Sequence, residues 1–265
     1  MKRPNPLAGL RIGCVQYLNS RPLIHGLPDI ALAHPSQLAA RLRAGDLDAA
    51  LVPVVELLRT PERYLVVDGV GIGSAGPVYS VFVAHQRPIE GLVAVTADPA
   101  SLTSIHLFQV LASGVWKRRV ALLPESAGNQ TNSALGRLLI GNQAIACRME
   151  SERAGDGVQF WDLGEQWTAW TGMPFVYAVW VLRRGLACAP HVADAFRAVS
   201  EAGQRAISEI AGADTDFGEA FATRYLTEHI RFQLGAPERA GLARFSQELE
   251  RLELVEENRV ALEFV

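Results

Sequence analysis

The stretch DLGEQWTAWTGMPFVYAVW, residues 162–180, joins a polar segment to an unbroken apolar run. Gly172 and Pro174 stand just before that run, and both residue types form turns. Residues 175–182 then carry no charged side chain, as expected of a strand that helices cover on both faces. The stretch therefore predicts a loop followed by a buried strand. Pro174 and Phe175, at the junction, form either the wall of a small-molecule cleft or ordinary core.

Upstream of this stretch, the first part of the chain alternates strand and helix patterns. Residues 10–15 form an apolar run that predicts a strand. Residues 36–45 predict a short helix, with Ser36 as its N-cap and Gly45 in the left-handed closing position. Residues 48–55 are apolar almost throughout and predict a strand that is buried on both faces. This order is that of a βαβ unit.

The same alternation returns in the middle of the chain and then stops. Residues 91–96 predict a strand, and residues 104–112 predict a helix that Gly114 ends. Residues 191–254 instead show the apolar spacing of three amphipathic helices, with no strand pattern between them. The patterns therefore predict a second sheet followed by a helical C-terminal part.

Two aromatic, strand-like stretches, residues 78–83 and 175–182, are placed to carry the chain out of one lobe and back into it. We therefore predict a two-lobed α/β protein. Residues 1–84 and 177–265 would build the first lobe, and residues 85–176 the second. Such a protein holds its ligand in the cleft between the lobes and closes by a hinge motion.

Composition limits the function classes. The 265 residues are 49% hydrophobic and 20% charged, with 25 Lys and Arg against 28 Asp and Glu and a formal net charge of -3. Because no basic patch is interleaved with aromatic residues, we expect no nucleic-acid partner. No stretch approaches the roughly 18 apolar residues of a membrane helix. The first residues also lack the apolar core of a signal peptide, so we expect a cytoplasmic protein with no membrane partner.

The sequence lacks the common signatures of metal and cofactor chemistry. Cys14, Cys147 and Cys188 are far apart and follow no metal-binding spacing, so we expect reduced, buried thiols. There is no Walker loop, no GxGxxG after a strand, no GxSxG elbow and no pair of metal-spaced histidines. We expect neither a cofactor nor a metal. Among the histidines, His25 lies near a candidate site, although a solvent-facing role fits it better than acid–base work.

The first candidate site is YLNSRPL, residues 17–23, which follows the first strand at the edge where open α/β sheets bind ligands. The amide of Asn19 both donates and accepts hydrogen bonds, and Arg21 can pair with a carboxylate. The alternative is an Asn or Ser cap on a helix that begins at Pro22. Both interpretations can hold at once.

The second candidate site is DPASLTS, residues 98–104, again between a strand and a helix. The free backbone N–H groups at a helix start attract an anion, and Ser101, Thr103 and Ser104 add hydroxyl donors. Simple capping by Ser101 or Thr103 is the alternative, but three hydroxyl residues in four positions exceed what capping requires. We therefore predict a carboxylate-binding site here. Ser80 is a further candidate, because it is a polar residue inside an apolar run.

Taken together, these segments resemble the chorismate dehydratases of the futalosine route to menaquinone. The resemblance rests on the Tyr-to-Pro motif and on five later segments: Val52-Pro53-Val54, Ser80-Val81, residues 96–104, Ile140-Gly141-Asn142 and residues 162–180. It implies the two-lobed fold of type II periplasmic binding proteins. It also implies the removal of water from chorismate, the small-molecule partner, to give 3-((1-carboxyvinyl)oxy)benzoate.

The resemblance also assigns roles to residues. Asn19 would be the catalytic residue near the reacting ring, while Ser80, Thr103 and Ser104 would hold the substrate carboxylates. The full predicted substrate-binding set is Ser80, Ser101, Thr103, Ser104, Asn142, Pro174 and Phe175. The family often has Gly-Asp where this chain has Gly141-Asn142, a change that removes a carboxylate and keeps a hydrogen-bonding amide.

The two candidate site segments, residues 17–23 and 98–104, offer no convincing protein base, since neither contains a His or a Glu. We therefore expect a substrate carboxylate to take the proton, with Asn19 orienting the reacting group or assisting the leaving hydroxide. A non-catalytic solute receptor for a small carboxylate and a regulator's effector domain share this fold. The missing signal-peptide pattern argues against the receptor, and the missing helix-turn-helix pattern argues against the regulator.

Overall fold

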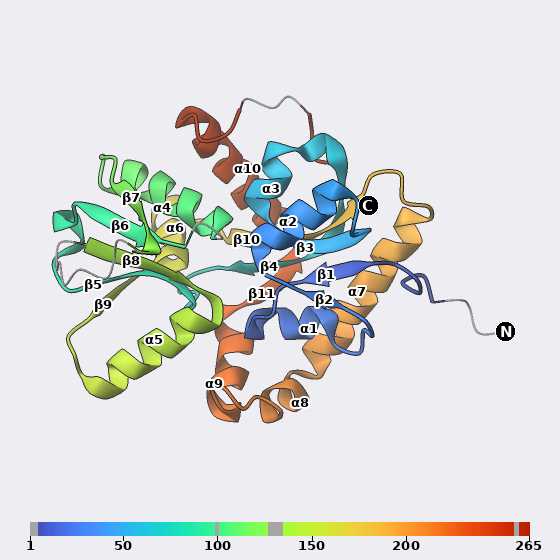
Figure 1. Ribbon diagram of the computed structural model, residues 1–265, viewed down its shortest axis with the longest axis horizontal. Coiled ribbons are helices and arrows are strands. Elements are labelled where there is room, and N and C mark those ends of the chain that lie inside the picture. The colour runs from blue at the N-terminus through green and yellow to red at the C-terminus, as the bar shows by residue number, and fades with distance from the viewer. Residues whose placement is uncertain (1–4, 99–100, 127–134, 257–259) are drawn as a thin grey trace.

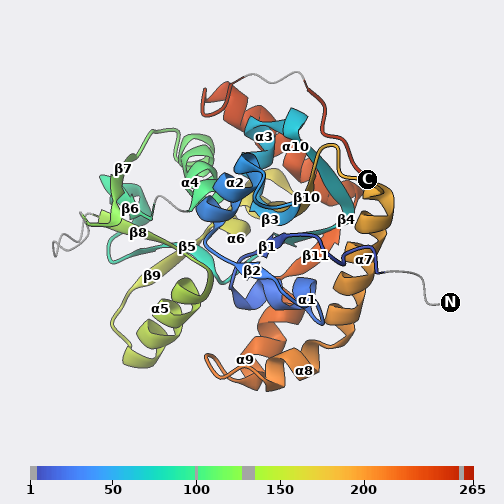
Figure 2. The same cartoon turned by 45° about the vertical axis from the view of Figure 1, so that its right-hand side comes forward.

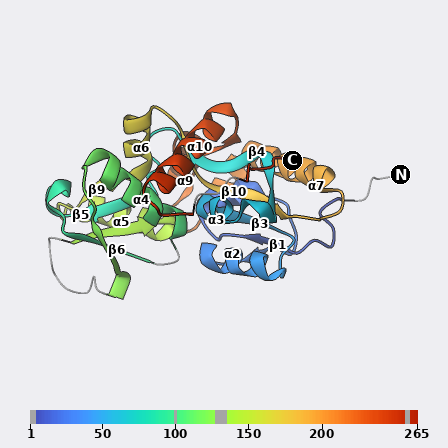
Figure 3. The same ribbon diagram turned by 90° about the horizontal axis from the view of Figure 1, so that it is seen from above.

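The computed structural model describes residues 5–98, 101–126, 135–256 and 260–265, which form two β-sheets with helices on both faces of each (Figure 1). The first sheet has the strand order β11-β4-β10-β3-β1-β2, and the second has the order β7-β6-β8-β5-β9. We call each sheet with its helices a lobe. The two lobes lie side by side when the molecule is viewed from above (Figure 3). The prediction of a two-lobed α/β protein is confirmed.

The first lobe is built from both ends of the chain. Its strands are β1 (Ile12–Cys14), β2 (Ala31–Leu32), β3 (Ala49–Pro53), β4 (Tyr64–Ser74), β10 (Phe175–Arg183) and β11 (Arg231–Leu234). Its helices are α1 (Arg21–Ile24), α2 (Pro35–Ala44), α3 (Val54–Arg59), α7 (Ala189–Arg205), α8 (Ile207–Gly212), α9 (Glu219–Arg224) and α10 (Ala236–Arg251). Helices α2, α3 and α10 cover one face of the sheet, and α1 and α7 cover the other (Figures 1 and 2). Strands β1, β2 and β3 pair in parallel, while β10 runs antiparallel between β3 and β4.

The second lobe comes from the middle of the chain. Its strands are β5 (Val81–His85), β6 (Ala94–Ala97), β7 (Ala121–Pro124), β8 (Leu135–Ile140) and β9 (Gln159–Asp162). Helices α4 (Leu102–Val115) and α6 (Leu163–Thr171) lie on one side of its sheet, and α5 (Gly141–Ala154) lies on the other (Figures 1 and 2).

The chain leaves the first sheet after Ser74 and enters the second at Val81, so residues 75–80 form the outward crossing. It returns between Thr171 and Phe175. Strand β5 pairs within the second sheet and β10 within the first. The predicted lobe boundaries, between residues 84 and 85 and between residues 176 and 177, fall inside β5 and β10. As the limits of the units that move in hinge closure, they stay predictions.

The opening stretch of the sequence folds differently from the expected loop. Residues 163–171 form helix α6, because the Asp162 side chain accepts hydrogen bonds from the amides of Gly164 and Glu165 and caps the helix start. Gly172 ends the helix at φ +70°, and β10 follows as predicted. The turn-forming residues Gly172 and Pro174, which follow this nine-residue helix, led to the wrong prediction of a loop.

One predicted strand ends earlier than its apolar run, because a helix begins inside that run. The run at residues 48–55 stops as a strand at Pro53, and Val54 begins α3. Apolar runs alone do not separate a buried strand from a buried helix start, which explains this error. In the second lobe, Ile140 ends β8, and Gly141, at φ +61°, starts α5 directly after it.

Helix ends show further corrections. The N-cap of α2 is His34 and not Ser36, since Pro35 takes the first helical position, whereas Gly45 closes the helix at φ +80° as predicted. Gly114 does not end α4, which runs from Leu102 to Val115. A Cβ atom at Gly114 would lie 2.5 Å from the Trp170 ring, so the glycine allows α4 and α6 to pack closely.

Two other expectations also fail. Strand β11 interrupts the C-terminal helices. Its residues Phe232 and Leu234 are buried, whereas Arg231 and Gln233 are exposed. This alternation covers only four residues, too few to outweigh the helical spacing around it. Of the thiols, Cys14 is buried, but Cys147 is partly exposed and Cys188 is exposed.

Candidate functional site

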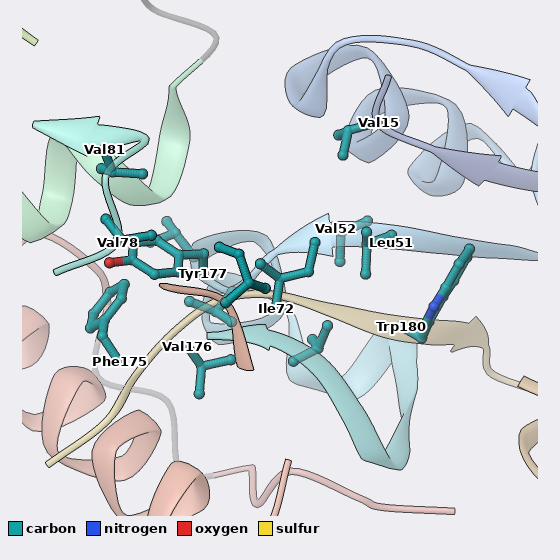
Figure 4. Close-up of a cluster of buried hydrophobic side chains, with 14 of the residues drawn as sticks. Val15, Leu51, Val52, Ile72, Val78, Val81, Phe175, Val176, Tyr177 and Trp180 are labelled. Carbon is teal, nitrogen blue, oxygen red and sulfur yellow. The ribbon is translucent and has the colours of Figure 1, made fainter. Parts of the chain in front are cut away.

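A pocket that is partly open to solvent lies between the two lobes; the space in it is about 600 Å³ when the adjoining open solvent is included, and about 70 Å³ of it is open to the centre of a water-sized molecule. The first lobe lines it with the loop after β1, the end of β3 and strands β4 and β10, and the second lobe with the crossing segment and the starts of α4 and α5. Most of these side chains are apolar, among them Val15, Leu51, Ile72, Val78 and Val81. In the close-up of this cluster the ring of Tyr177 lies beside Val78 (Figure 4). Such a pocket suits a small ring held by a few polar groups.

Asn19 lines this pocket from a short 3-10 turn, Leu18–Ser20, directly after β1. The turn is fixed because the Ser20 hydroxyl donates to the backbone oxygen of Val15 at 2.7 Å. The Asn19 amide nitrogen donates to the hydroxyl of Tyr225 at 3.2 Å. Its carbonyl oxygen is buried and has no hydrogen-bond partner among the described residues. A buried acceptor without a partner is costly, and a ligand is one way to satisfy it.

Ser80 and Tyr225 form a buried pair behind the pocket lining. The Tyr225 hydroxyl donates to the Ser80 hydroxyl at 2.7 Å, and both residues are fully buried. Burial raises the pKa of Tyr225 above its usual value, so the phenol keeps its proton near neutral pH. The Ser80 backbone oxygen accepts from the amide of Gly141 at 2.8 Å and so ties β5 to the start of α5. A direct contact of Ser80 with substrate stays a prediction.

The start of α4 brings Ser101, Thr103 and Ser104 together at the pocket, each nearly or fully buried. Ser101 stands at the N-cap, yet within the described chain its hydroxyl makes no capping hydrogen bond. The N–H groups of the first turn and the hydroxyls can donate to a ligand, and the dipole of this helix favours an anion. The Thr103 hydroxyl also accepts from the amide of Val55 at 3.5 Å, a contact between the lobes.

Besides Ser80, three predicted substrate-binding residues stand apart from the described pocket lining. The Asn142 side-chain oxygen accepts from the amide of Leu18 at 2.9 Å and links α5 to the Asn19 turn. The Pro174 backbone oxygen accepts from the indole of Trp167 at 3.2 Å. Phe175 packs in the core with its ring 5.2 Å from that of Trp167. Their contact with substrate stays a prediction. His25 likewise lies at the end of α1, outside the described lining.

Three tyrosines belong to this region, although sequence reasoning gave none of them a role. Tyr17 lines the pocket and packs against Gly141, where a Cβ atom would lie 2.7 Å from its ring. Burial, together with Asp98, raises the pKa of Tyr17. Tyr177 contacts the Ser74 hydroxyl at 3.2 Å. Tyr225 lies in a stretch that was predicted to be an amphipathic helix. A hydroxyl group on the apolar face of that helix was the signal that could have marked Tyr225 as a functional residue.

Asp162 holds the crossing segment in place. Its carboxylate accepts from the amides of Val78 at 3.1 Å and Tyr79 at 2.7 Å while it also caps α6. Tyr79 adopts a positive φ of 66°, which is uncommon outside glycine. Because Asp162 is buried, its pKa is raised, although the backbone amides oppose that shift. One carboxylate therefore fixes both the outward crossing and the helix before the return crossing.

Residues 10–251 match the menaquinone biosynthesis family. The chain belongs to this family. It is 27% identical over 263 residues to a chorismate dehydratase of Thermus thermophilus, covering 90% of this chain and 94% of that protein. The family resemblance drawn from the sequence is therefore confirmed, and the protein is an enzyme of menaquinone biosynthesis.

Solved structures agree on the fold. A structure from Archaeoglobus fulgidus has a TM-score of 0.72 at 14% identity, covering 93% of this chain and 98% of its own. A Candida albicans protein described as having the generic periplasmic binding protein fold has a TM-score of 0.60 at 10% identity, covering 94% of this chain and 91% of its own. Among the described residues, every helix is too short or too polar to cross a membrane.

Proposed function

We propose that this member of the family is a chorismate dehydratase, a hydro-lyase that removes water from chorismate in the futalosine route to menaquinone. The observation that carries the proposal is the arrangement of the pocket. The unpartnered carbonyl of Asn19 and the hydroxyl-rich start of α4 belong to one otherwise apolar pocket between the lobes. Family membership and the likeness to the Thermus thermophilus enzyme support the choice of substrate.

Each part of the pocket suits one part of chorismate. The apolar side chains from β3, β4 and the crossing segment offer a surface for the ring. Ser101, Thr103 and Ser104, with the amides at the start of α4, offer donors for a carboxylate. The Asn19 carbonyl can accept a hydrogen bond from the ring hydroxyl.

The reaction asks little of the protein beyond this placement. A ring carbon loses its proton, and the electron pair of that C–H bond becomes a new C=C bond. The C–O bond to the ring hydroxyl breaks, its electrons stay on oxygen, and the released hydroxide takes up the proton as water. The ring becomes aromatic, which drives the elimination. We assign the base to a carboxylate of the substrate, and the protein holds substrate and leaving group in a reactive arrangement.

Incubation of the purified protein with chorismate, without added metal or nucleotide, tests the proposal. We expect an aromatic product lighter than chorismate by one water, detected by chromatography with absorbance and mass. Asn19→Ala should lose most of the turnover while chorismate still binds. Chorismate that binds and is recovered unchanged would refute the dehydratase and favour a solute-binding protein for small carboxylates.

A further inference from the structure

Behind the pocket, Asn19, Tyr225 and Ser80 form a hydrogen-bonded row that joins three distant parts of the chain. Asn19 follows β1, Ser80 ends the outward crossing, and Tyr225 begins the π-helical turn Tyr225–His229 after α9. The two links of the row measure 3.2 Å and 2.7 Å between donor and acceptor. Tyr225 and Ser80 are fully buried, so water does not reach either hydroxyl. The row therefore has a defined direction along which each hydrogen points.

That direction decides how the Asn19 amide is turned. Tyr225 gives its single hydroxyl hydrogen to Ser80 and can then only accept from Asn19. An amide that faces this acceptor must present its NH₂ group to it. The carbonyl oxygen, about 120° away on the same planar group, is consequently the amide atom without a partner. A reversed amide would place its carbonyl against the Tyr225 hydroxyl, which would then have to withdraw its hydrogen from Ser80.

The Tyr225 ring is held independently of its hydroxyl. It stacks on Phe221 with centroids 5.8 Å apart and an interplanar angle of 11°. It is also fully buried within the hydrophobic core. Removing the hydroxyl alone should therefore leave the ring in place, which separates the role of the hydroxyl from the packing of the side chain.

We propose that Tyr225 is a positioning residue: its hydroxyl, polarised toward Ser80, fixes the amide of Asn19 so that the carbonyl accepts a hydrogen bond from the ring hydroxyl of the substrate. This inference rests on the proposed function for the identity of the substrate. Tyr225 itself stays behind the described pocket lining and acts through Asn19.

The test is a double-mutant cycle of Tyr225→Phe and Asn19→Ala, with Tyr64→Phe as the matched control. Tyr64 is another buried tyrosine, and its hydroxyl donates to Glu56 at 2.9 Å, away from the pocket. We expect Tyr225→Phe to lower kcat about ten-fold or more while KM changes less than about three-fold. In the Asn19→Ala background the same change should alter kcat by less than about two-fold, because the residue it positions is gone. Tyr64→Phe should keep the wild-type kcat.

Equal effects of Tyr225→Phe in both backgrounds would overturn the inference, since a purely structural residue acts additively. A measurement that does not depend on turnover tests the positioning role of Tyr225 separately from the proposed function. In the wild type, the Asn19 side-chain NH₂ signals, identified by their loss in Asn19→Ala, should exchange slowly with solvent; Tyr225→Phe should speed that exchange and Tyr64→Phe should not. Unchanged exchange in Tyr225→Phe would refute the positioning role. A wild type that leaves chorismate intact would refute only the proposed function and the substrate contact derived from it.

Discussion

Replacing Gly141 by alanine is predicted to disable the pocket while leaving the fold intact. Gly141 is the first residue of α5, lines the pocket and faces Tyr17 from the opposite lobe. A Cβ atom there would lie 2.7–2.9 Å from three atoms of the Tyr17 ring. Real Cβ contacts are not that short, so either the ring must leave the pocket wall or the lobes must separate.

The substitution has two costs that act on different equilibria. At φ +61° an alanine is strained by roughly 1–2 kcal/mol, and this cost lowers the stability of the folded protein in any arrangement of its lobes. The clash with Tyr17 exists only when the lobes are closed, and overpacking of this kind costs about 1–3 kcal/mol. Since about 1.4 kcal/mol is a factor of ten in population, we expect kcat/KM to fall by roughly 5- to 150-fold.

Gly155 provides the matched control, because it ends the same helix at φ +62° and a Cβ atom there meets no described atom within 4 Å. Gly155→Ala should lose a similar amount of stability to chemical denaturation and keep its activity. Both variants are compared by urea unfolding and by steady-state conversion of chorismate. If Gly141→Ala kept a kcat/KM within about three-fold of Gly155→Ala, the Tyr17 contact would not be part of the active arrangement.

Three further perturbations follow from buried contacts. Asp162→Asn should lower the free energy of unfolding by about 1–3 kcal/mol in urea titrations, because the carboxylate accepts from four backbone amides with two oxygens, and in asparagine one of those oxygens becomes an NH₂ group that cannot accept; an unchanged midpoint would contradict this. Gly203→Ala should destabilise by at least about 1–3 kcal/mol, since its Cβ atom would lie 1.8 Å from a backbone oxygen of α1, whereas Gly212→Ala, with open space, serves as control. Burial and the cation of Arg59 lower the pKa of His106, which as a neutral ring accepts from that guanidinium at 2.9 Å. As the pH falls below about 6.5, the unfolded chain therefore takes up a proton on His106 before the folded protein does, and the stability of the fold should drop from pH 7 toward pH 5. Thermal melts at both pH values should show a smaller drop for His106→Gln.

The sequence predicted the architecture because its main signals are local. The apolar runs of β3 and β10 mark buried strands, and Gly45 marks a helix end through its positive φ. Helix α6 was missed because the deciding contact is an Asp162 side chain that reaches the next turn, in a stretch dominated by turn-forming residues. Strand β11 was missed because its four residues pair with β4 from far away in the chain.

The candidate site was predictable where its residues follow strand ends, and it was not predictable where contacts join distant residues or involve backbone atoms. Asn19 and the hydroxyls of α4 follow strand ends, and the structure brings them to one pocket. Tyr225 lies 206 positions from Asn19, so no local pattern reveals their contact. Two of the links between the lobes run from main-chain amides, with Leu18 donating to Asn142 and Val55 to Thr103.

These interlobe links also bear on the residue that departs from the family's usual Gly-Asp pair. Asn142 accepts the Leu18 amide with its carbonyl oxygen, a contact that an aspartate would make with a carboxylate oxygen. The amide therefore keeps the hydrogen bond that holds the Asn19 turn against α5 and removes one negative charge beside a pocket that would receive an anion. Since like charges repel most strongly where water is excluded, the loss of that charge favours binding of a carboxylate substrate in the closed arrangement.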